Sequence, residues 1–290
     1  ADSVKIQTNE IEESYMQNST SYKTFKNKNF SNKELLKLKK YSERLGVVFF
    51  STPGDIKSLN RLVKIKIPVI KISSGLATNL PLIGESLKKK IPTIISTGFS
   101  TKEDLNDLKK FISKFKFRKV AILKCTSNYP ADPRDLDLNS IDSLKKKFNL
   151  PIGYSDHSLG DLAPVIAVSC GAVIIEKHFT LDRDGGGPDD SFSLELEDMT
   201  NLCSGAKSAW SALGEINYER KTSEESNIKF RRSLYFVKDI AEGEVITEDH
   251  IKSIRPGYGL APKHYNEVVG KKAIKKAVTG TALGWEYIVK

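Results

Sequence analysis

Two histidines occupy matching positions at the ends of two consecutive apolar segments. His157 ends the segment Ile152–His157 (IGYSDH), and His178 ends the segment Val173–His178 (VIIEKH). Both segments read as buried β-strands, and parallel strands would bring the two imidazoles to the same edge of a sheet. Neutral imidazole is a common ligand of borderline divalent ions, and two histidines leave positions open for water and substrate. The pair predicts a metal site, whereas either histidine alone would suit a structural hydrogen bond.

Lysines and hydroxyl side chains gather at the ends of the other strand-like segments. Ammonium groups neutralise phosphate and carboxylate, and hydroxyls fix orientation, so this composition suits a phosphorylated acid. A strand-end lysine could instead form a Schiff base with a carbonyl substrate, as in a covalent aldolase, or simply point to solvent. The residues concerned are Lys5, Thr52, Lys71, Ser74, Ser96, Thr97, Lys124, Thr126, Ser127 and Lys177.

The glycine-rich segment at residues 182–190 (DRDGGGPDD) superficially resembles a calcium loop. It lacks the glutamate at the twelfth loop position and the flanking pair of helices, which argues against calcium. We expect a loop over the mouth of the site that presents Asp189 to a hydroxylated substrate. An ordinary flexible connection is the alternative.

Helix-like segments separate most of the strand-like ones. Apolar side chains recur at helical intervals in residues 32–45 and 100–115, and residues 140–148, 162–169 and 194–213 are further candidates. This alternation predicts a parallel barrel whose functional residues lie at the C-terminal ends of its strands. Such a barrel has eight strands, and seven are found, so we expect a TIM-type (β/α)8 barrel that lacks its first strand and helix in this chain. The seven segments are Val4–Thr8, Val47–Thr52, Val69–Ser74, Thr93–Gly98, Val120–Ser127, Ile152–His157 and Val173–His178.

Two domains and a linker are expected. Residues 1–213 would form the barrel. Residues 214–229 are polar and charged and show neither the helical nor the strand periodicity of apolar residues, which is typical of a linker. Residues 230–290 hold short apolar pieces between Glu-Gly, Pro-Gly and Thr-Gly turns, which predicts a small, mostly β domain. A domain of roughly sixty residues is only marginally stable alone, so we expect it to pack against the barrel or against a partner. The pieces are Ser233–Val237, Val245–Ile246, Ile251–Ile254 and Ala273–Lys276.

The composition argues against several classes of protein. No apolar stretch approaches the length of a bilayer, and the first residues resemble neither a signal peptide nor a transit peptide, so we expect a cytoplasmic protein without membrane partners. Cys125, Cys170 and Cys203 are widely spaced and odd in number, which argues against a disulfide framework. The net charge of +10 comes mostly from lysines scattered over helix faces, which favours a solvated surface over nucleic-acid binding.

Nine short motifs, in order along nearly the whole chain, resemble the sialic acid synthases. That family condenses phosphoenolpyruvate with an N-acylated mannosamine-type sugar. The resemblance implies that open-chain N-acetylmannosamine is converted to N-acetylneuraminic acid with release of phosphate. It also implies that the last sixty or so residues form the family's SAF domain, which is antifreeze-protein-like. The motifs are KIQT (5–8), FSTP (50–53), KISSG (71–75), STG (96–98), CTSNYP (125–130), GYSDH (153–157), EKHFT (176–180), GGPD (186–189) and RPGYG (255–259).

The same resemblance implies roles for individual residues. His157 and His178 would bind a divalent ion, typically Mn²⁺, with Mg²⁺ or Co²⁺ as alternatives, and Glu176 would act beside them. Arg255 would reach the active site of the other subunit in a domain-swapped homodimer. Phosphoenolpyruvate would lie among Lys5, Thr52, Lys71, Ser74, Ser96, Ser127 and Ser155, and the sugar would contact Gln7, Tyr129, Asp189 and Arg255.

Two departures from the family pattern leave alternatives open. After KISSG the family usually has an acidic residue, and this chain has Leu76. Loss of that carboxylate would suit a less hydroxylated, 2,4-diacetamido-6-deoxy sugar, as used by a legionaminic or pseudaminic acid synthase, unless Leu76 merely packs near the mouth. The absent first strand would normally bring another functional glutamate. A degenerate, non-catalytic barrel fragment is therefore the alternative of another class.

Overall fold

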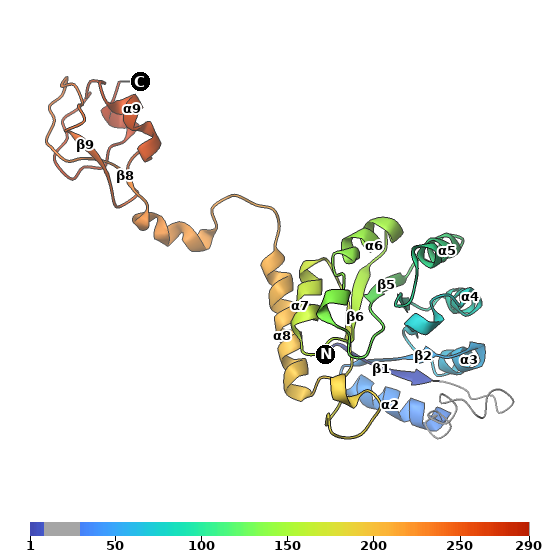
Figure 1. The fold of residues 1–290 in the computed structure, drawn as a ribbon. Coiled ribbons are helices and arrows are strands. Elements are labelled where there is room, and N and C mark those ends of the chain that lie inside the picture. The colour runs from blue at the N-terminus through green and yellow to red at the C-terminus, as the bar shows by residue number, and fades with distance from the viewer. Residues whose placement is uncertain (9–29, 290) are drawn as a thin grey trace. The chain divides into compact units, whose positions relative to one another are not determined.

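The computed structural model describes residues 1–8 and 30–289. The chain divides into two compact units, Ala1–Gly214 and Glu215–Lys290, and each is described here by itself (Figure 1). The residues predicted as a linker, 214–229, contain most of a nine-residue helical segment, η4 (Thr222–Phe230). None of the helices in the described ranges is long and apolar enough to cross a membrane.

The N-terminal unit is a curled parallel sheet with helices on its outer side (Figure 1). Its strands are ordered as in the sequence, and each pairs in parallel with the next. Among the described residues, no strand pairs with the outer edge of the first or the last of them. Within the residues that the structure describes, the prediction of a barrel-like parallel sheet without the usual first strand is thus confirmed. The strands are β1 (Ser3–Thr8), β2 (Val48–Pro53), β3 (Ile70–Ile72), β4 (Thr93–Ser96), β5 (Val120–Cys125), β6 (Ile152–Asp156) and β7 (Ile175–Lys177).

The helices begin where the sequence offers side-chain caps. Ser31, Asp55 and Thr101 each accept a hydrogen bond from the backbone amide three residues on, which satisfies one of the free N–H groups of the first turn. The five helices predicted from periodicity form close to their predicted bounds, and α3 and α4 add to them. The helices are α2 (Asn32–Arg44), α3 (Ile56–Lys64), α4 (Leu80–Lys88), α5 (Lys102–Ile112), α6 (Ser140–Phe148), α7 (Leu162–Ser169) and α8 (Leu196–Leu213).

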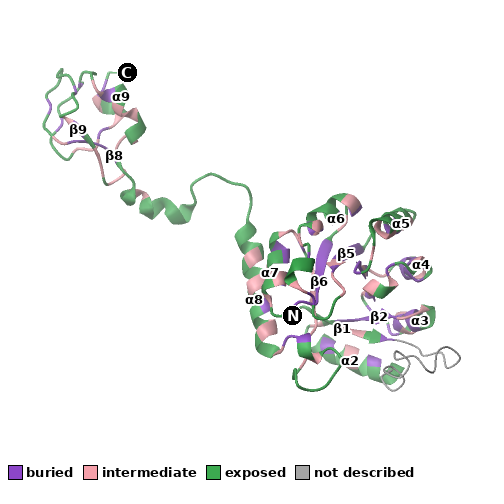
Figure 2. Ribbon diagram, viewed as in Figure 1, coloured by how far each residue is buried: buried purple, intermediate pink, exposed green. Residues whose placement is uncertain are grey.

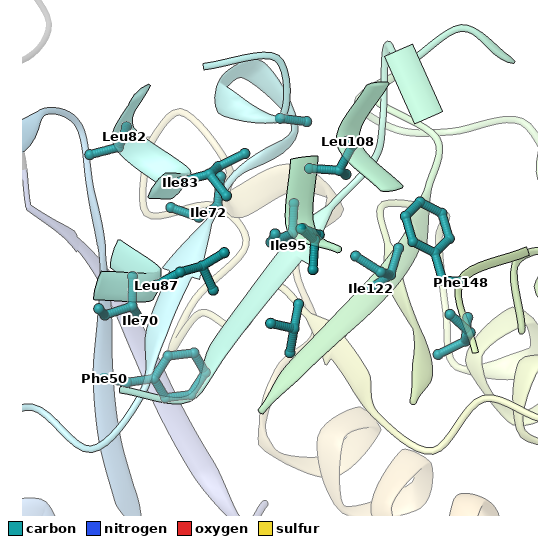
Figure 3. Close-up of a cluster of buried hydrophobic side chains, with 14 of the residues drawn as sticks. Phe50, Ile70, Ile72, Leu82, Ile83, Leu87, Ile95, Leu108, Ile122 and Phe148 are labelled. Atoms are coloured by element: carbon teal, nitrogen blue, oxygen red, sulfur yellow. The ribbon is translucent and has the colours of Figure 1, made fainter. Parts of the chain in front are cut away.

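The main core lies between the sheet and its helices (Figures 2 and 3). Ile70 and Ile72 of β3 are fully buried there and belong to the same cluster as Leu82 and Leu87 of α4. Side chains alternate across a strand, so Lys71, between the two isoleucines, must point to the opposite face of the sheet. Burial of the apolar face therefore fixes which residues line the inside of the barrel.

The C-terminal unit has a core of its own around a short antiparallel pair, β8 (Ser233–Phe236) and β9 (Ile251–Ile254). Its apolar pieces at Val245–Ile246 and Ala273–Lys276 contribute only isolated bridges, to Lys272 and Ile288 respectively. Besides η4, short helical turns complete the unit, among them α9 (Tyr265–Val268). The unit is thus a small domain with little regular structure besides one two-stranded sheet.

Candidate active site

Glu176 of β7 lies among cationic and hydroxyl groups on the inner face of the sheet. Its Oε1 atom is 2.8 Å from Lys71 Nζ and accepts a 2.8 Å hydrogen bond from Ser155 Oγ, and its Oε2 atom is 3.6 Å from Lys5 Nζ. Burial alone would raise the pKa of Glu176, but the two ammonium groups and the hydroxyl lower it to about 2. Glu176 is therefore a carboxylate at any physiological pH.

The two lysines near Glu176 carry more positive charge than its single carboxylate can neutralise. Lys71 is 1 % exposed, and burial lowers the pKa of its ammonium group, which the attraction of Glu176 opposes. Lys5, on β1, is partly exposed and lies on the same face of the sheet, since both lysines contact Glu176. With both lysines protonated, two cations would share one carboxylate, which suits the binding of an additional anion.

His157 and His178 lie side by side, as predicted from their matching positions. Their ring centroids are 5.2 Å apart. His157 Nδ1 is 2.9 Å from the backbone oxygen of Thr126, which can only accept, so Nδ1 carries a proton and the neutral ring has its lone pair on Nε2. Burial opposes protonation of His157, but its contacts with Cys125 and the Thr126 oxygen raise its pKa above the usual value. Burial lowers the pKa of His178 to about 4 despite the nearby Asp189, so its imidazole is neutral at physiological pH. His178 thus offers a neutral nitrogen as a ligand, and His157 offers Nε2 when its ring is neutral.

These histidines fit a divalent ion but provide only part of its coordination. The described residues include no group of three or more His, Cys, Asp and Glu side chains arranged to hold a metal. A hydrogen bond from the second ring nitrogen to a backbone carbonyl, as at His157, is the usual way in which a metal-ligating imidazole is oriented. Substrate oxygens and water would have to supply the remaining positions.

Buried hydroxyls of the site are available for contact with a polar molecule. In the described part of the chain, the side-chain oxygens of Thr52 and Ser96 are buried without a hydrogen-bond partner. An unpaired buried hydroxyl costs about 1–3 kcal/mol, so such groups suit contact with a bound polar molecule. Close by in sequence, Gly98 donates its N–H to Ser74 Oγ at 3.0 Å, and a Cβ at Gly98 would lie 2.0 Å from Ser127 Oγ. Gly98 thus allows Ser74 and Ser127 to come together.

Aromatic and acidic side chains border the histidines. The Tyr129 ring lies 4.2 Å from that of His157, and the Phe192 ring lies 5.2 Å from that of His178, measured between centroids. Asp189 Oδ2 is 3.5 Å from His178 Nδ1, with 55 % of the Asp189 side chain exposed. The predicted loop residue is therefore at the site and remains accessible.

The predicted residues outside this cluster have different settings. Gln7 is exposed on β1, two residues after Lys5 and thus on the same face of the sheet. Arg255 is exposed in the C-terminal unit, at the end of β9. Leu76 is half-buried and packs against the main core, which matches the packing explanation of this departure from the family pattern.

The sequence did not predict the contacts of Cys125 or the position of Lys177. The buried Cys125 thiol is 3.8 Å from His157 Nδ1 and 3.6 Å from Ser127 Oγ. Lys177, named above among the lysines at strand ends, projects away from Lys5 and Lys71 and pairs with Asp156 at 2.5 Å. The alternation of side chains along β7 could have revealed this, since Lys177 lies between Glu176 and His178.

Comparison with known proteins shows the family to which the chain belongs. The model of the NeuB family matches residues 1–218, and that of the SAF domain matches residues 231–289. The chain belongs to the NeuB family. Pseudaminic acid synthase of Campylobacter jejuni is 42 % identical over 82 % of this NeuB-family chain and 69 % of its own length. The N,N'-diacetyllegionaminic acid synthase of Legionella pneumophila is 35 % identical over 94 % of the chain and 78 % of its own length.

The solved structure of one relative shows the same architecture. The N-acetylneuraminic acid synthetase of Leptospira borgpetersenii, crystallised with citrate, superposes with a TM-score of 0.74 at 34 % identity, covering 80 % of this chain and 81 % of that one. The predicted membership in the sialic acid synthase family and the predicted SAF domain are both confirmed. Because relatives with different sugar products are similar to the chain, family membership leaves the acceptor sugar open.

Proposed function

We propose that the protein condenses phosphoenolpyruvate with the open-chain form of an acylated amino sugar, giving a nine-carbon 2-keto-3-deoxy acid and phosphate. The observation that carries this proposal is the juxtaposition of Lys5, Lys71 and Glu176 on the inner face of the sheet. Excess positive charge beside unpaired hydroxyls suits a small, multiply charged anion. The imidazole pair beside Asp189 suits a hydroxylated, polarisable partner.

In this proposal the lysines and hydroxyls hold phosphoenolpyruvate. Lys5 and Lys71 neutralise its charges, while Thr52, Ser74, Ser96, Ser127 and Ser155 fix its orientation so that its C3 carbon faces the sugar aldehyde. Attack by C3 leaves positive character at C2. Because Glu176 stays ionised, its carboxylate stabilises that charge electrostatically until water adds at C2 and phosphate departs.

His157 and His178 would hold a divalent ion, Mn²⁺ being typical of the family and Mg²⁺ or Co²⁺ the alternatives. When bound, the ion supplies Lewis-acid polarisation of the aldehyde oxygen of the sugar. Gln7, Tyr129 and Asp189 would orient the hydroxyl and acyl groups of the sugar. Arg255 would complete the sugar site from a partner subunit.

Two acceptors are candidates. N-acetylmannosamine is the acceptor that the sequence resemblance implies, with N-acetylneuraminic acid as product. Similarity to the Campylobacter pseudaminic acid synthase supports a 2,4-diacetamido-6-deoxy sugar instead. The position of Leu76 against the main core gives no reason to prefer either, since its side chain is engaged in packing.

The test is phosphate release from phosphoenolpyruvate with each sugar, with mass-spectrometric identification of the product. The proposal predicts release that requires a sugar, disappears in EDTA and returns with Mn²⁺. Activity that persists in EDTA, together with covalent trapping of the carbonyl substrate by borohydride, would instead indicate a Schiff-base lysine aldolase. Binding of phosphoenolpyruvate without turnover of either sugar would favour the non-catalytic barrel.

A further inference from the structure

A buried ion pair lies on the outer face of the sheet, directly behind the proposed site. Lys177 Nζ is 2.5 Å from Asp156 Oδ2, and the two side chains are 2 % and 0 % exposed. Lys177 also donates to the backbone oxygen of Ser158, the residue after His157. Tyr154 Oη and Ser158 N donate to Asp156 Oδ1 at 2.8 and 3.0 Å, so the carboxylate is fully engaged.

The strand register places this pair between the functional residues. Asp156 on β6 is the direct partner of Lys177 on β7, and Ser155 is the partner of Glu176. Ser155 and Glu176 bond to each other on the inner face, so the next pair along, Asp156 and Lys177, projects to the outer face. The residues that follow Asp156 and Lys177 are the two histidines.

The backbone of each histidine is also held by a hydrogen bond to a neighbouring loop. The backbone oxygen of His157 accepts from Ala131 N, and that of His178 accepts from Leu194 N, each at 2.9 Å. Those bonds attach each histidine to its own loop, whereas the Lys177 ammonium adds to the strand pairing a side-chain link between β7 and the residue that follows His157. The ion pair and the Ser158 oxygen therefore act as a brace across the two strands.

We propose that Lys177 and Asp156 are a positioning pair that sets the spacing and orientation of His157 and His178. The proposal rests on the proposed metal site, and it assigns the pair no contact with substrate. A buried ion pair is weak evidence for stability, because desolvation offsets much of the attraction, but it can specify one arrangement of the groups it joins. Groups that hydrogen-bond to metal ligands change metal affinity about 10–100-fold when removed, which sets the scale for a pair that lies one residue from each ligand.

The decisive variant is Lys177→Met, which keeps an unbranched apolar side chain one atom shorter than that of lysine but removes its charge and donors. In the full chain without metal, ¹⁵N NMR of the imidazoles reads the Nδ1 proton of His157, which is bonded to Thr126. We expect that proton to exchange with solvent about tenfold faster or more, as local opening becomes easier. We also expect the Mn²⁺ dissociation constant, measured by electron paramagnetic resonance, to rise about 10–100-fold.

Three further variants separate positioning from general loss of stability. Lys177→Arg retains a charge and donors, and it should restore both readouts to within about threefold of the wild type. Leu87→Ala makes a cavity in α4, far along the sheet, and should lower Tm without changing either readout. If Lys177→Met does not fold, Asp156→Asn keeps the shape of the carboxylate without its charge and should give the same changes.

A folded Lys177→Met protein with an unchanged Nδ1 proton and unchanged Mn²⁺ affinity overturns the proposal. Equal changes in Leu87→Ala overturn it as well, because the effect would then follow from stability alone. If the wild-type chain itself binds no Mn²⁺, the proposed metal site fails. The NMR comparison still decides whether the pair positions His157.

Discussion

Glu176 balances the charge of two lysines, so its removal should affect chemistry and substrate binding differently. Glu176→Gln keeps the hydrogen bond to Ser155 but leaves Lys5 and Lys71 without their counter-charge. We expect kcat to fall about 10²–10³-fold, because the charge that develops at C2 loses its stabilising carboxylate. The KM for phosphoenolpyruvate should stay the same or fall, since the anion site becomes more positive. Steady-state kinetics of phosphate release measures both; a higher KM with unchanged kcat would contradict the assigned role.

Gly98 is required by close contact rather than by backbone conformation. A Cβ there would lie 2.0 Å from Ser127 Oγ and 2.7 Å from Ser74 Oγ, so one or both hydroxyls must move. Gly98→Ala should raise the KM for phosphoenolpyruvate about tenfold or more, as displacement of oriented hydroxyls costs about 1–3 kcal/mol. The matched control is Gly75→Ala, where an added Cβ meets nothing within 4 Å. Equal kinetics of the two variants would show that Ser74 and Ser127 do not hold the substrate.

The sequence predicted which residues lie at strand ends. It did not predict equally well which face of the sheet each side chain points to, because that depends on the alternation of side chains along the strand. Lys71 was predicted in the site, and it lies there because Ile70 and Ile72 are both buried in the core. Lys177 has the same setting in the sequence, at the end of an apolar run, yet it projects to the other face. The exact register of a three-residue strand determines that difference, and an apolar run alone does not give it.

Helices and strands were predicted correctly where a local sequence signal, such as a helix cap, marks their ends. The caps at Ser31 and Thr101 begin α2 and α5 within two residues of the predicted starts. The apolar pieces of the C-terminal unit gave weaker predictions, because Val245–Ile246 and Ala273–Lys276 are bounded by turns and form only single bridges. Their positions depend on contacts between distant segments, such as Ala273 with Ile288, which no local pattern reveals.

The contact between β6 and β7 depends on Gly153. An added Cβ at this position would lie 2.5 Å from the backbone oxygen of Ile174 and 2.5 Å from Leu123 Cδ2. Backbone cannot yield as a surface side chain does, so Gly153→Ala should destabilise the barrel by about 1–3 kcal/mol. Urea unfolding followed by circular dichroism measures the change, with Gly75→Ala as the control. A midpoint equal to that of the wild type would show that the two strands can separate at no cost.

At the scale of the molecule, the C-terminal unit presents Arg255 on a fixed turn. The Ser233 hydroxyl, buried in β8, donates to the backbone oxygen of Pro256 and accepts from the N–H of Gly259, at 2.7 and 2.9 Å. These bonds hold the RPGYG turn against the small core, while Arg255 and Tyr258 remain exposed. An exposed arginine on a rigid turn suits recognition of a substrate or of another subunit.

The proposed role of Arg255 in a partner's site leads to a prediction about mixed subunits. Arg255→Ala should weaken binding of the sugar more than that of phosphoenolpyruvate, and His178→Ala should abolish turnover. In a swapped dimer of one subunit of each kind, one site combines an intact His178 with the other subunit's intact Arg255. Mixing the two variants should therefore raise activity above that of either variant alone, up to about half that of the wild type in each hybrid dimer.

The same mixture provides its own controls. Exchange of subunits is confirmed first by native mass spectrometry of differently tagged chains. An Arg255→Ala/His178→Ala double variant mixed with the wild type should give hybrid dimers in which neither site is complete, because each site lacks one of the two residues. Recovery of activity in the first mixture and its loss in the second would support the swapped arrangement. If confirmed hybrids of the single variants stay inactive, while the double-variant hybrids retain one working site, Arg255 serves the barrel of its own chain.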